Sequence, residues 1–315
     1  MTGHGSNAGA EEADPAMDTL ALTAVRYGQP EVLEYTRFAL PALANDQARI
    51  AVAAAGVNPV DARRMTGEIR HGDPPLFLGT EFAGTIVELG SYATQWSVGD
   101  EVLGAGGAFT HATVIDVPVA NLVSRPPTVP WVVAGSLAGA SQTAVTILDD
   151  LGPITSLLVH GGAGGVGTIT VQLARQAGIT VVATGSPANH DYLRALGAIP
   201  VAYGAGLVER IQEAHPGRFG ASVDMAGTDE ATQSSLATVA PDGVIASITA
   251  LPPSSPRITQ IWRRKDPTSV ARVAAGIAVG DLTWEVSSTH PFADAAKAYE
   301  AILRRHVRGK SVLTF

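Results

Sequence analysis

An apolar run that ends in a glycine-rich turn, at residues 157–167, constrains the fold of this 315-residue chain more than any other segment. Leu157–Val159 is strand-like, and Gly162, Gly164 and Gly167 then have the G-x-G-x-x-G spacing. In such turns the first glycine permits a tight turn, the second lets a pyrophosphate approach the backbone, and the third lets the next helix pack closely on the strand. The chain contains 34 glycines, so this spacing is weak evidence alone and the flanking residues have to support it.

The residues on both sides of the turn do support it. Apolar residues recur after the turn at helical spacing, and Gly178 follows where a C-terminal cap is expected. The run 179–183 then predicts a buried strand. A strand, a turn, a helix and a second strand within about 30 residues are typical of a βαβ unit. We therefore expect a dinucleotide site, with phosphates at the helix N-terminus; an α/β crossover that binds nothing is the alternative.

The second predicted strand indicates which dinucleotide binds. NAD sites usually place Asp or Glu at the end of this strand, where the carboxylate binds the ribose hydroxyls. Here residues 183–187 carry no carboxylate, and the first one to follow is Asp191. This leaves room for the 2′-phosphate of NADP, to which the Ser186 hydroxyl could donate. Arg194 could add charge, but we expect it one turn into the next helix, facing solvent. The pattern therefore favours NADPH.

Composition limits the remaining possibilities. With 46% hydrophobic and 16% charged residues the chain is globular, and its net charge of −8 argues against nucleic acid or an anionic membrane surface as a partner. No apolar run approaches the roughly 18 residues of a membrane span. Residues 1–17 are small, polar and acidic, which predicts a disordered tail and no secretory signal. Met17 is a candidate native start, and we expect a cytoplasmic protein.

The chain contains no cysteine, so it forms no disulfide and no thiolate zinc site. Asp61, His71, Glu81 and His111 offer oxygen and nitrogen ligands in the first half of the chain. Their spacings match no known metal pattern, and scattered polar loop residues are the simpler interpretation. We expect no metal site.

The order of predicted elements indicates two domains. Residues 18–128 have the pattern of short strands with frequent Gly and Pro, which predicts a mostly β module. A helix-like stretch at 132–148 and alternating strands and helices follow, which predicts a doubly wound parallel sheet. We expect one domain from 18–128 and 282–315, and a dinucleotide-binding domain from 129–281. The clearest predicted strands are 21–26, 48–55, 84–89, 101–103, 112–115, 199–203, 221–225 and 244–249.

Four segments match the pattern of a known family. They are residues 55–61 (AGVNPVD), 78–84 (LGTEFAG), the glycine turn with His160 before it and 172–174 (QLA) after it, and 308–310 (RGK) ahead of the last strand. With the domain order above, the chain resembles the medium-chain dehydrogenase/reductase superfamily, and within it the zinc-free quinone oxidoreductase branch.

The resemblance implies a fold and a reaction. The fold is α/β, with a GroES-like, mostly β catalytic domain and a doubly wound Rossmann domain. NADPH would lie in the cleft between them, and its hydride would pass to a quinone or to an α,β-unsaturated carbonyl compound such as an enone. Relatives use the region of 252–266 at a dimer edge. This segment is shorter and more polar here, so a homodimer stays an open expectation.

The resemblance also implies site residues. Asn58 would lie near the nicotinamide and the substrate carbonyl, as the catalytic residue. The pyrophosphate would meet Gly164, Gly165 and Val166, and Ser186 with Tyr203 would contact the 2′-phosphate. The full set of implied cofactor-binding residues is Thr143, Gly162, Gly164, Gly165, Val166, Gly167, Ser186, Tyr203, Ala226, Thr249 and Leu251.

Some of these positions have structural interpretations instead. Asp61 is read as a cap of the helical turn after Asn58, and His160 as a strand-end packing residue. Glu81 is read as a structural carboxylate rather than a base. Tyr203 is equally well explained as a half-buried strand end.

The chain also departs from the family pattern. Ile69 stands where established enoyl reductases often carry a tyrosine, and Asn189 stands where a lysine is common. Arg70 and His71 are then candidate proton sources. Two alternatives stay open: an alcohol dehydrogenase without metal, and a protein that binds NADPH without turnover, acting as a sensor or structural partner.

Overall fold

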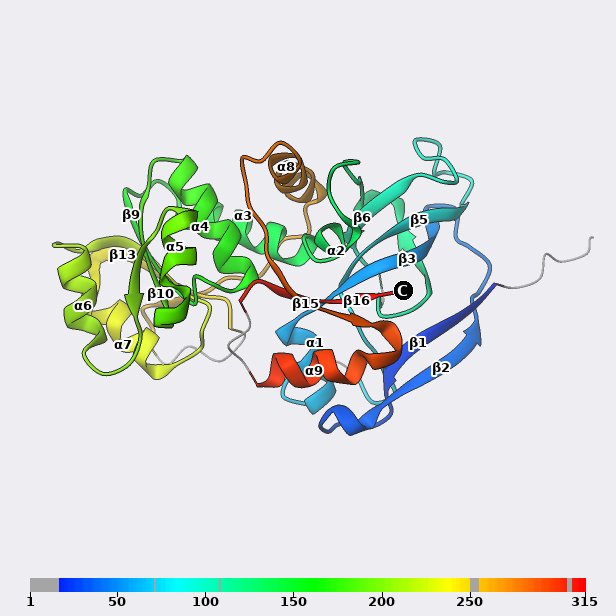
Figure 1. Ribbon diagram of the computed structural model, residues 1–315, viewed down its shortest axis with the longest axis horizontal. Coiled ribbons are helices and arrows are strands. Elements are labelled where there is room, and N and C mark those ends of the chain that lie inside the picture. Colours follow the sequence, from blue (N-terminus) through cyan, green and yellow to red (C-terminus); the bar gives the residue numbers. More distant parts are fainter. Residues whose placement is uncertain (1–16, 71, 108, 250–254, 305–307) are drawn as a thin grey trace, which may run out of the picture.

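The computed structural model describes residues 17–70, 72–107, 109–249, 255–304 and 308–315, and the statements below refer to these. Within them the strands form three sheets of six, seven and three strands. Figure 1 shows the six-stranded sheet with its helices at one end of the molecule and the other two sheets at the other end. No helix in these ranges is both long and apolar enough to cross a membrane.

The six-stranded sheet is parallel, with the order β11-β10-β9-β12-β13-β14. The chain starts this sheet at β9 in the middle, moves outward to β11, and returns to place β12 on the other side of β9. In open α/β sheets the ligand binds where the strand order reverses in this way, beyond the carboxyl ends of the strands. The strands are β9 (Ser156–His160), β10 (Thr180–Gly185), β11 (Ile199–Ala202), β12 (Phe219–Asp224), β13 (Val239–Ser247) and β14 (Ile258–Gln260).

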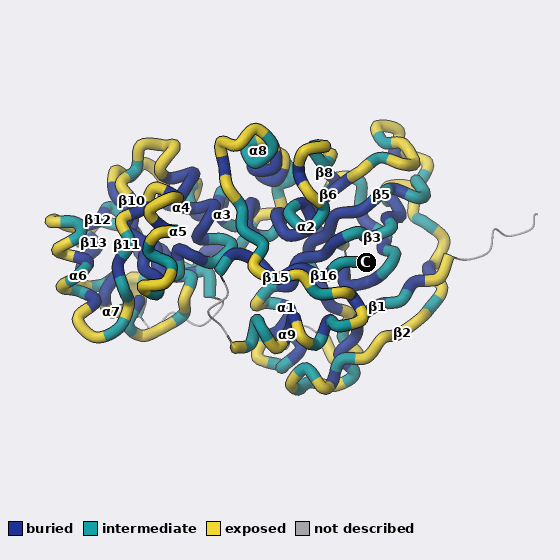
Figure 2. Tube along the Cα trace, viewed as in Figure 1, coloured by how far each residue is buried: buried dark blue, intermediate teal, exposed yellow. Residues whose placement is uncertain are grey.

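Helices cover both faces of this sheet. Leu157 and Val159 of β9 pack into one core and Leu158 into another, because successive side chains of a strand point to opposite faces. Both cores are buried, as the dark strands in Figure 2 show. The helices of this half are α3 (Ala138–Leu151), α4 (Gly165–Gln176), α5 (His190–Leu196), α6 (Leu207–Ala214), α7 (Asp229–Thr238) and α8 (Pro267–Ala278).

The other two sheets form the mostly β half. The order β15-β16-β3-β5-β6-β8, with β7 also paired to β3, brings the end of the chain back beside β3, and β2-β1-β4 forms the small sheet. The strands are β1 (Asp18–Ala24), β2 (Leu33–Ala39), β3 (Gln47–Val57), β4 (Leu76–Phe77), β5 (Glu81–Leu89), β6 (Glu101–Ala105), β7 (Val114–Pro118), β8 (Leu122–Ser124), β15 (Val286–Pro291) and β16 (Lys310–Thr314). The helices are α1 (Pro59–Thr66), α2 (Trp131–Ala134) and α9 (Ala295–Leu303).

One predicted element is wrong. The single helix expected over 132–148 is two helices, α2 and α3, separated at Gly135. The Gly135 carbonyl accepts the Gly56 N–H at 2.8 Å, and a Cβ on Gly135 would lie 2.5 Å from the Ala54 carbonyl oxygen. This close approach to β3 turns the backbone out of the helical path. The doubly wound parallel sheet is confirmed.

Candidate active site

The glycine turn connects β9 to α4. Its left-handed residue is Gly161, with φ of 80°, so Gly161 makes the tight turn, and the assignment of that role to Gly162 is wrong. Gly162 is needed for another reason: its Cβ would lie 2.8 Å from the Ala183 Cβ on the neighbouring strand β10. Gly167 has the predicted packing role, because its Cβ would lie 2.6 Å from the carbonyl oxygens of both Gly161 and Gly162.

The N-terminus of α4 fits a phosphate group. Gly164 is the N-cap, and the N–H groups of Gly165, Val166 and Gly167 follow it, where an α-helix has no acceptor of its own. A Cβ at Gly164 would meet no described atom nearer than 3.5 Å, so this glycine leaves the backbone open to a ligand. Free N–H groups and the positive end of the helix dipole together bind anions.

Two polar residues directly follow the carboxyl ends of β10 and β11. Gly185 pairs with Ala202 in the parallel register, and the next residues are Ser186 and Tyr203. Ser186 is half-buried and Tyr203 is exposed. As predicted, Arg194 faces solvent, where it pairs with Asp191 at 2.6 Å.

The carboxylate at the end of β12 holds its own turn through one oxygen. Oδ1 of Asp224, the last residue of β12, accepts the N–H groups of Ala226 and Gly227 at 2.8 and 2.9 Å. Burial raises the pKa of Asp224, and these two hydrogen bonds lower it less. Oδ1 of Asp224 therefore fixes the turn that follows β12.

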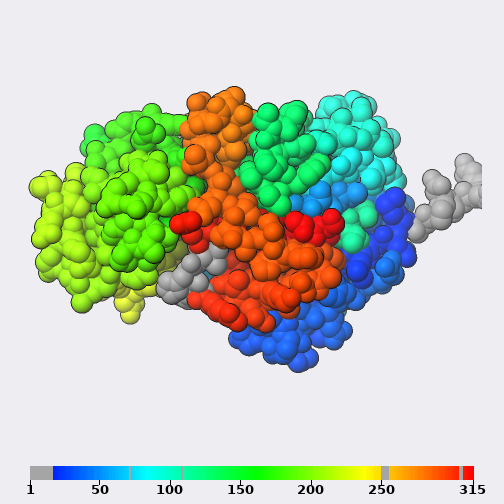
Figure 3. All heavy atoms as spheres, in the orientation of Figure 1, coloured from blue at the N-terminus to red at the C-terminus, as the bar shows by residue number. Residues whose placement is uncertain are grey.

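The two halves of the molecule meet at the glycine turn. The Gly309 N–H donates to the Ala163 carbonyl at 3.0 Å, and a Cβ on Gly165 would lie 2.9 Å from Cδ of Lys310. A second link joins α1 to the loop after β13, where Nη1 of Arg63 donates to the Thr249 carbonyl. Figure 3 shows the C-terminal residues, in orange and red, on the surface between the two halves. The start of β16 is therefore part of the same region as the glycine turn.

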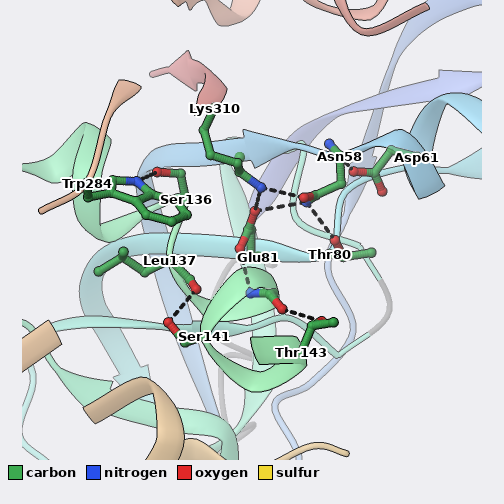
Figure 4. Close-up of polar contacts among 12 residues, drawn as sticks. Asn58, Asp61, Thr80, Glu81, Ser136, Leu137, Ser141, Thr143, Trp284 and Lys310 are labelled. Atoms are coloured by element: carbon green, nitrogen blue, oxygen red, sulfur yellow. Dashed lines mark hydrogen bonds and ion pairs between the residues drawn. The ribbon is translucent and has the colours of Figure 1, made fainter. Parts of the chain in front are cut away.

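A buried network continues from Lys310 into the mostly β half (Figure 4). The Lys310 ammonium donates to Asn58 Oδ1 and to Glu81 Oε1, the latter at 2.5 Å. Asn58 Nδ2 donates to Glu81 Oε1 at 2.9 Å and to Thr80 Oγ1 at 3.2 Å. Glu81 Oε2 accepts the Gly139 N–H at the start of α3, at 2.7 Å. One ammonium, one amide and one carboxylate thus join β16, α1, β5 and α3.

The charges of this network compensate one another. The side chains of Lys310 and Glu81 are 7% and 0% exposed. Burial raises the pKa of Glu81, but the charge and hydrogen bond of Lys310, with the bonds from Gly139 and Asn58, lower it further, and its pKa lies below the usual value. Glu81 is therefore an ionised structural carboxylate and not a base, as its sequence context indicates.

Asp61 and His160 have the structural roles that were predicted for them. Asp61 Oδ2 accepts the Asn58 N–H at 2.9 Å, which closes a capping box at the start of α1. Burial raises the pKa of this fully buried carboxyl. His160 Nε2 lies 3.1 Å from Ser235 Oγ inside the core, and burial lowers the pKa of His160 to about 4.

Asp61, Glu81 and His111, the described members of the four side chains considered as metal ligands, do not form a metal site with other described residues. His111 is bonded to Tyr299 through Nδ1 at 2.9 Å and to the Gly56 carbonyl through Nε2 at 3.1 Å. Because a carbonyl only accepts, Nε2 carries the hydrogen and Nδ1 accepts from the tyrosine. No three His, Cys, Asp or Glu side chains among the described residues are arranged to hold a metal, and His71 lies outside these residues.

Comparisons with known proteins agree with this architecture. Residues 44–145 match the alcohol dehydrogenase GroES-like domain family, and residues 165–279 match the zinc-binding dehydrogenase family. The chain is 35% identical over 172 residues to a trans-enoyl reductase of Aspergillus japonicus, which covers 48% of this chain and 50% of that protein. It therefore spans about half the length of this curated relative.

Solved structures match over nearly the whole chain. A quinone oxidoreductase of Coxiella burnetii is 27% identical with a TM-score of 0.85, over 95% of this chain and 100% of that one. A mycobacterial protein in complex with NADPH is 26% identical with a TM-score of 0.84, over 94% and 100% of the two chains.

The chain belongs to the medium-chain dehydrogenase/reductase superfamily. Within this superfamily it falls in the zinc-free quinone oxidoreductase and enoyl reductase-like branch, and it is an oxidoreductase. The GroES-like fold of the mostly β half and the Rossmann fold of the other half are thereby confirmed.

The family assignment leaves the individual site residues as predictions. Thr143 is half-buried and its hydroxyl donates to the Gly139 carbonyl at 2.7 Å, one turn from the Glu81 contact. Ala226 is exposed beyond β12, and Leu251 lies outside the described residues. The homodimer and the domain boundaries also stay predictions.

Sequence reasoning missed Lys310 as a site residue. It appeared only as part of the segment 308–310 that carries the family resemblance. The available signal was a lysine two residues before the apolar pair Val312-Leu313 of the last strand, where burial makes a charge costly unless it is paired.

Proposed function

We propose that this oxidoreductase uses NADPH as its nicotinamide cofactor and transfers a hydride to a quinone or to an α,β-unsaturated carbonyl compound. The observation that carries the cofactor choice is the end of β10, where Ser186 follows Gly185 and no Asp or Glu stands at residues 183–187, with Tyr203 directly after the paired end of β11. The acceptor class is supported by the trans-enoyl reductase and the quinone oxidoreductase to which the chain is similar.

The described residues fit this cofactor along the carboxyl edge of the parallel sheet. The N–H groups of Gly165 and Val166 would hold the pyrophosphate, and Ser186 with Tyr203 would hold the 2′-phosphate. Thr143 would lie on the nicotinamide-ribose side; its hydroxyl donates to the carbonyl of Gly139, whose N–H donates to Glu81. When bound, NADPH supplies the hydride; the protein supplies orientation and electrostatics.

The acceptor gains negative charge on its oxygen when it receives the hydride, and a hydrogen-bond donor has to stabilise that charge. Thr80 and Glu81 accept both hydrogens of the Asn58 amide, which supports a positioning role for Asn58 rather than a role as this donor. The proton that completes the reduction at carbon would come from water that reaches the cleft.

A fluorescence titration with NADPH and with NADH tests the cofactor choice. We expect NADPH to bind at least about tenfold more tightly, which corresponds to 1.4 kcal/mol. Ser186→Asp should reverse the preference, because a carboxylate there repels the 2′-phosphate and accepts from the ribose hydroxyls. Ser124→Asp is the matched control, since Ser124 is exposed on β8 and the charge change is the same.

Two outcomes would contradict the proposal. Equal affinity for both cofactors in the unmodified protein, or an unchanged preference in Ser186→Asp, would mean that the end of β10 does not select NADPH over NADH. Binding of NADPH without oxidation across a panel of quinones and enones would favour the alternative, a protein that binds the cofactor without turnover.

A further inference from the structure

The hydrogen bonds of the buried network fix the orientation of the Asn58 amide. Lys310 can only donate, so the Asn58 atom that faces it is the oxygen. Ionised Glu81 can only accept, so the atom that faces it is the nitrogen. The amide therefore has one orientation, and its second N–H is directed at Thr80 Oγ1.

This orientation determines what the Thr80 hydroxyl can do. Because Thr80 Oγ1 accepts from Asn58, its own hydrogen is left to donate, and that hydrogen has no acceptor among the described residues. Thr80 is half-buried, and its carbonyl is held by the Gly106 N–H at 3.1 Å. The other nearby threonine differs, since the Thr143 hydroxyl hydrogen is bonded to the Gly139 carbonyl.

A chain of aligned donors thus ends at Thr80. The Lys310 ammonium donates to the Asn58 oxygen, and the Asn58 nitrogen donates to the Thr80 oxygen, so each bond polarises the next. The hydrogen bond that Thr80 Oγ1 accepts from Asn58 makes this hydroxyl a stronger donor than an isolated one. The Lys310 side chain is only 7% exposed, whereas Thr80 is half-buried.

We propose that Thr80 is the oxyanion donor of this enzyme, with Asn58 and Lys310 as positioning residues that polarise it. This inference rests on the proposed reduction of an enone or quinone. In the reduction of an enone, the C4–H bond of the NADPH nicotinamide would break and its hydride would form a C–H bond at the β-carbon. The C=C π pair would become a double bond between the α-carbon and the carbonyl carbon, and the C=O π pair would move to the carbonyl oxygen. The Thr80 O–H donates a hydrogen bond to that oxygen without losing its proton, and water then protonates the α-carbon.

The test compares Thr80→Val with Thr80→Ser. Valine keeps the volume and removes the hydroxyl, whereas serine keeps the hydroxyl. We expect Thr80→Val to lower kcat by about 100-fold and Thr80→Ser to remain within a few-fold of the unmodified enzyme, in line with the loss of one oxyanion-hole donor. Titration with NADPH should give the same affinity in all three proteins, because Thr80 lies outside the residues that would hold the phosphates.

A spectroscopic readout separates the hydrogen bond from turnover. In the complex with NADP⁺ and a ¹³C=O-labelled enone, infrared difference spectra report the carbonyl stretch. The stretch should shift to lower frequency in the unmodified protein and in Thr80→Ser, and this shift should be lost in Thr80→Val.

One competing donor is Arg263, whose Nη1 would lie 3.7 Å from a Cβ on Gly139. Retention of the carbonyl shift and of kcat in Thr80→Val would overturn the proposal, and their loss in Arg263→Gln alone would assign the role to Arg263. These outcomes differ from failure of the proposed function, in which the unmodified protein itself would not bind NADPH or reduce any acceptor.

Discussion

Replacing Lys310 with methionine tests whether the buried ion pair holds the active site together. The substitution keeps an unbranched chain of similar length that can still pack on Gly165. It removes the ammonium from Asn58 and Glu81 and leaves the Glu81 carboxylate, which is 0% exposed, with only the Asn58 and Gly139 hydrogen bonds. The variant therefore isolates the cost of an uncompensated buried charge.

The expected magnitude follows from that burial. Removing one partner of a buried pair costs about 3–5 kcal/mol in the free energy of unfolding, because the other charge stays desolvated. The matched control is Lys297→Met on α9. Its ammonium lies 3.1 Å from Asp294, but the two side chains are 66% and 46% exposed, and such surface pairs contribute about 0–1 kcal/mol.

The loss of unfolding free energy in Lys310→Met should also depend on pH. In the unmodified protein the pKa of Glu81 lies below its usual value, so its stabilising contribution is present at neutral pH and is lost as the pH falls through that folded pKa. Without Lys310, burial raises the pKa of Glu81 instead. In the variant, Glu81 takes up a proton when the chain folds, and this proton uptake costs free energy at neutral pH. The loss of unfolding free energy relative to the unmodified protein is therefore largest near pH 7 and becomes smaller toward pH 4.

Urea denaturation followed by tryptophan fluorescence at pH 7.5 and pH 5 measures both effects. Trp284 is a suitable reporter, because its Nε1 donates to Ser136 at 3.0 Å beside the network (Figure 4). If Lys310→Met costs no more than Lys297→Met at pH 7.5, or if its deficit grows as the pH falls, the argument from buried charge is refuted. In the double variant with Glu81→Gln much of the lost stability should return, because the uncompensated charge is gone.

Two further predictions concern the Rossmann half. Gly167→Ala should lower NADPH affinity by at least about tenfold in the fluorescence titration, because its Cβ would lie 2.6 Å from two backbone oxygens of the turn that binds the pyrophosphate. The control Gly220→Ala, whose Cβ would make ordinary 3.4 Å contacts with Ile154, should change little. His160, with a folded pKa of about 4, binds a proton only in the unfolded chain between pH 4 and 6.5, so the unfolding free energy should fall by up to about 3 kcal/mol across that window as the pH drops. His160→Gln should flatten this slope in denaturation curves, and an equally steep slope would contradict the assignment.

The Rossmann half could be predicted from the sequence because its signals are local. The strand at 157–160, the glycine turn and the helix after it follow one another without interruption, and each element has its own periodicity. The same continuity allowed the carboxyl end of β10 to be located, and with it the missing carboxylate near Ser186. Contacts within one βαβ unit need no knowledge of the rest of the fold.

The mostly β half was predicted less completely because its elements depend on tertiary contacts. Strand β2 (Leu33–Ala39) is largely exposed and lacks the apolar alternation that identifies a strand, yet it pairs with β1 along seven residues. The break between α2 and α3 follows from the approach of Gly135 to Ala54, which no local pattern encodes. Propensity was overridden in both cases by a partner distant in sequence.

The active site also depends on contacts between residues that are distant in sequence, which local sequence patterns do not predict. Asn58 and Glu81 lie 252 and 229 residues before Lys310, and only the return of β16 beside β3 brings them together. A sequence can identify Asn58 as a turn residue with an amide, but whether that amide is free to donate depends on Lys310 and Thr80. The proposed chemistry therefore moves from Asn58 to Thr80 once both hydrogens of the Asn58 amide have been given acceptors, because a residue that donates to a substrate needs a hydrogen that the protein has not already used.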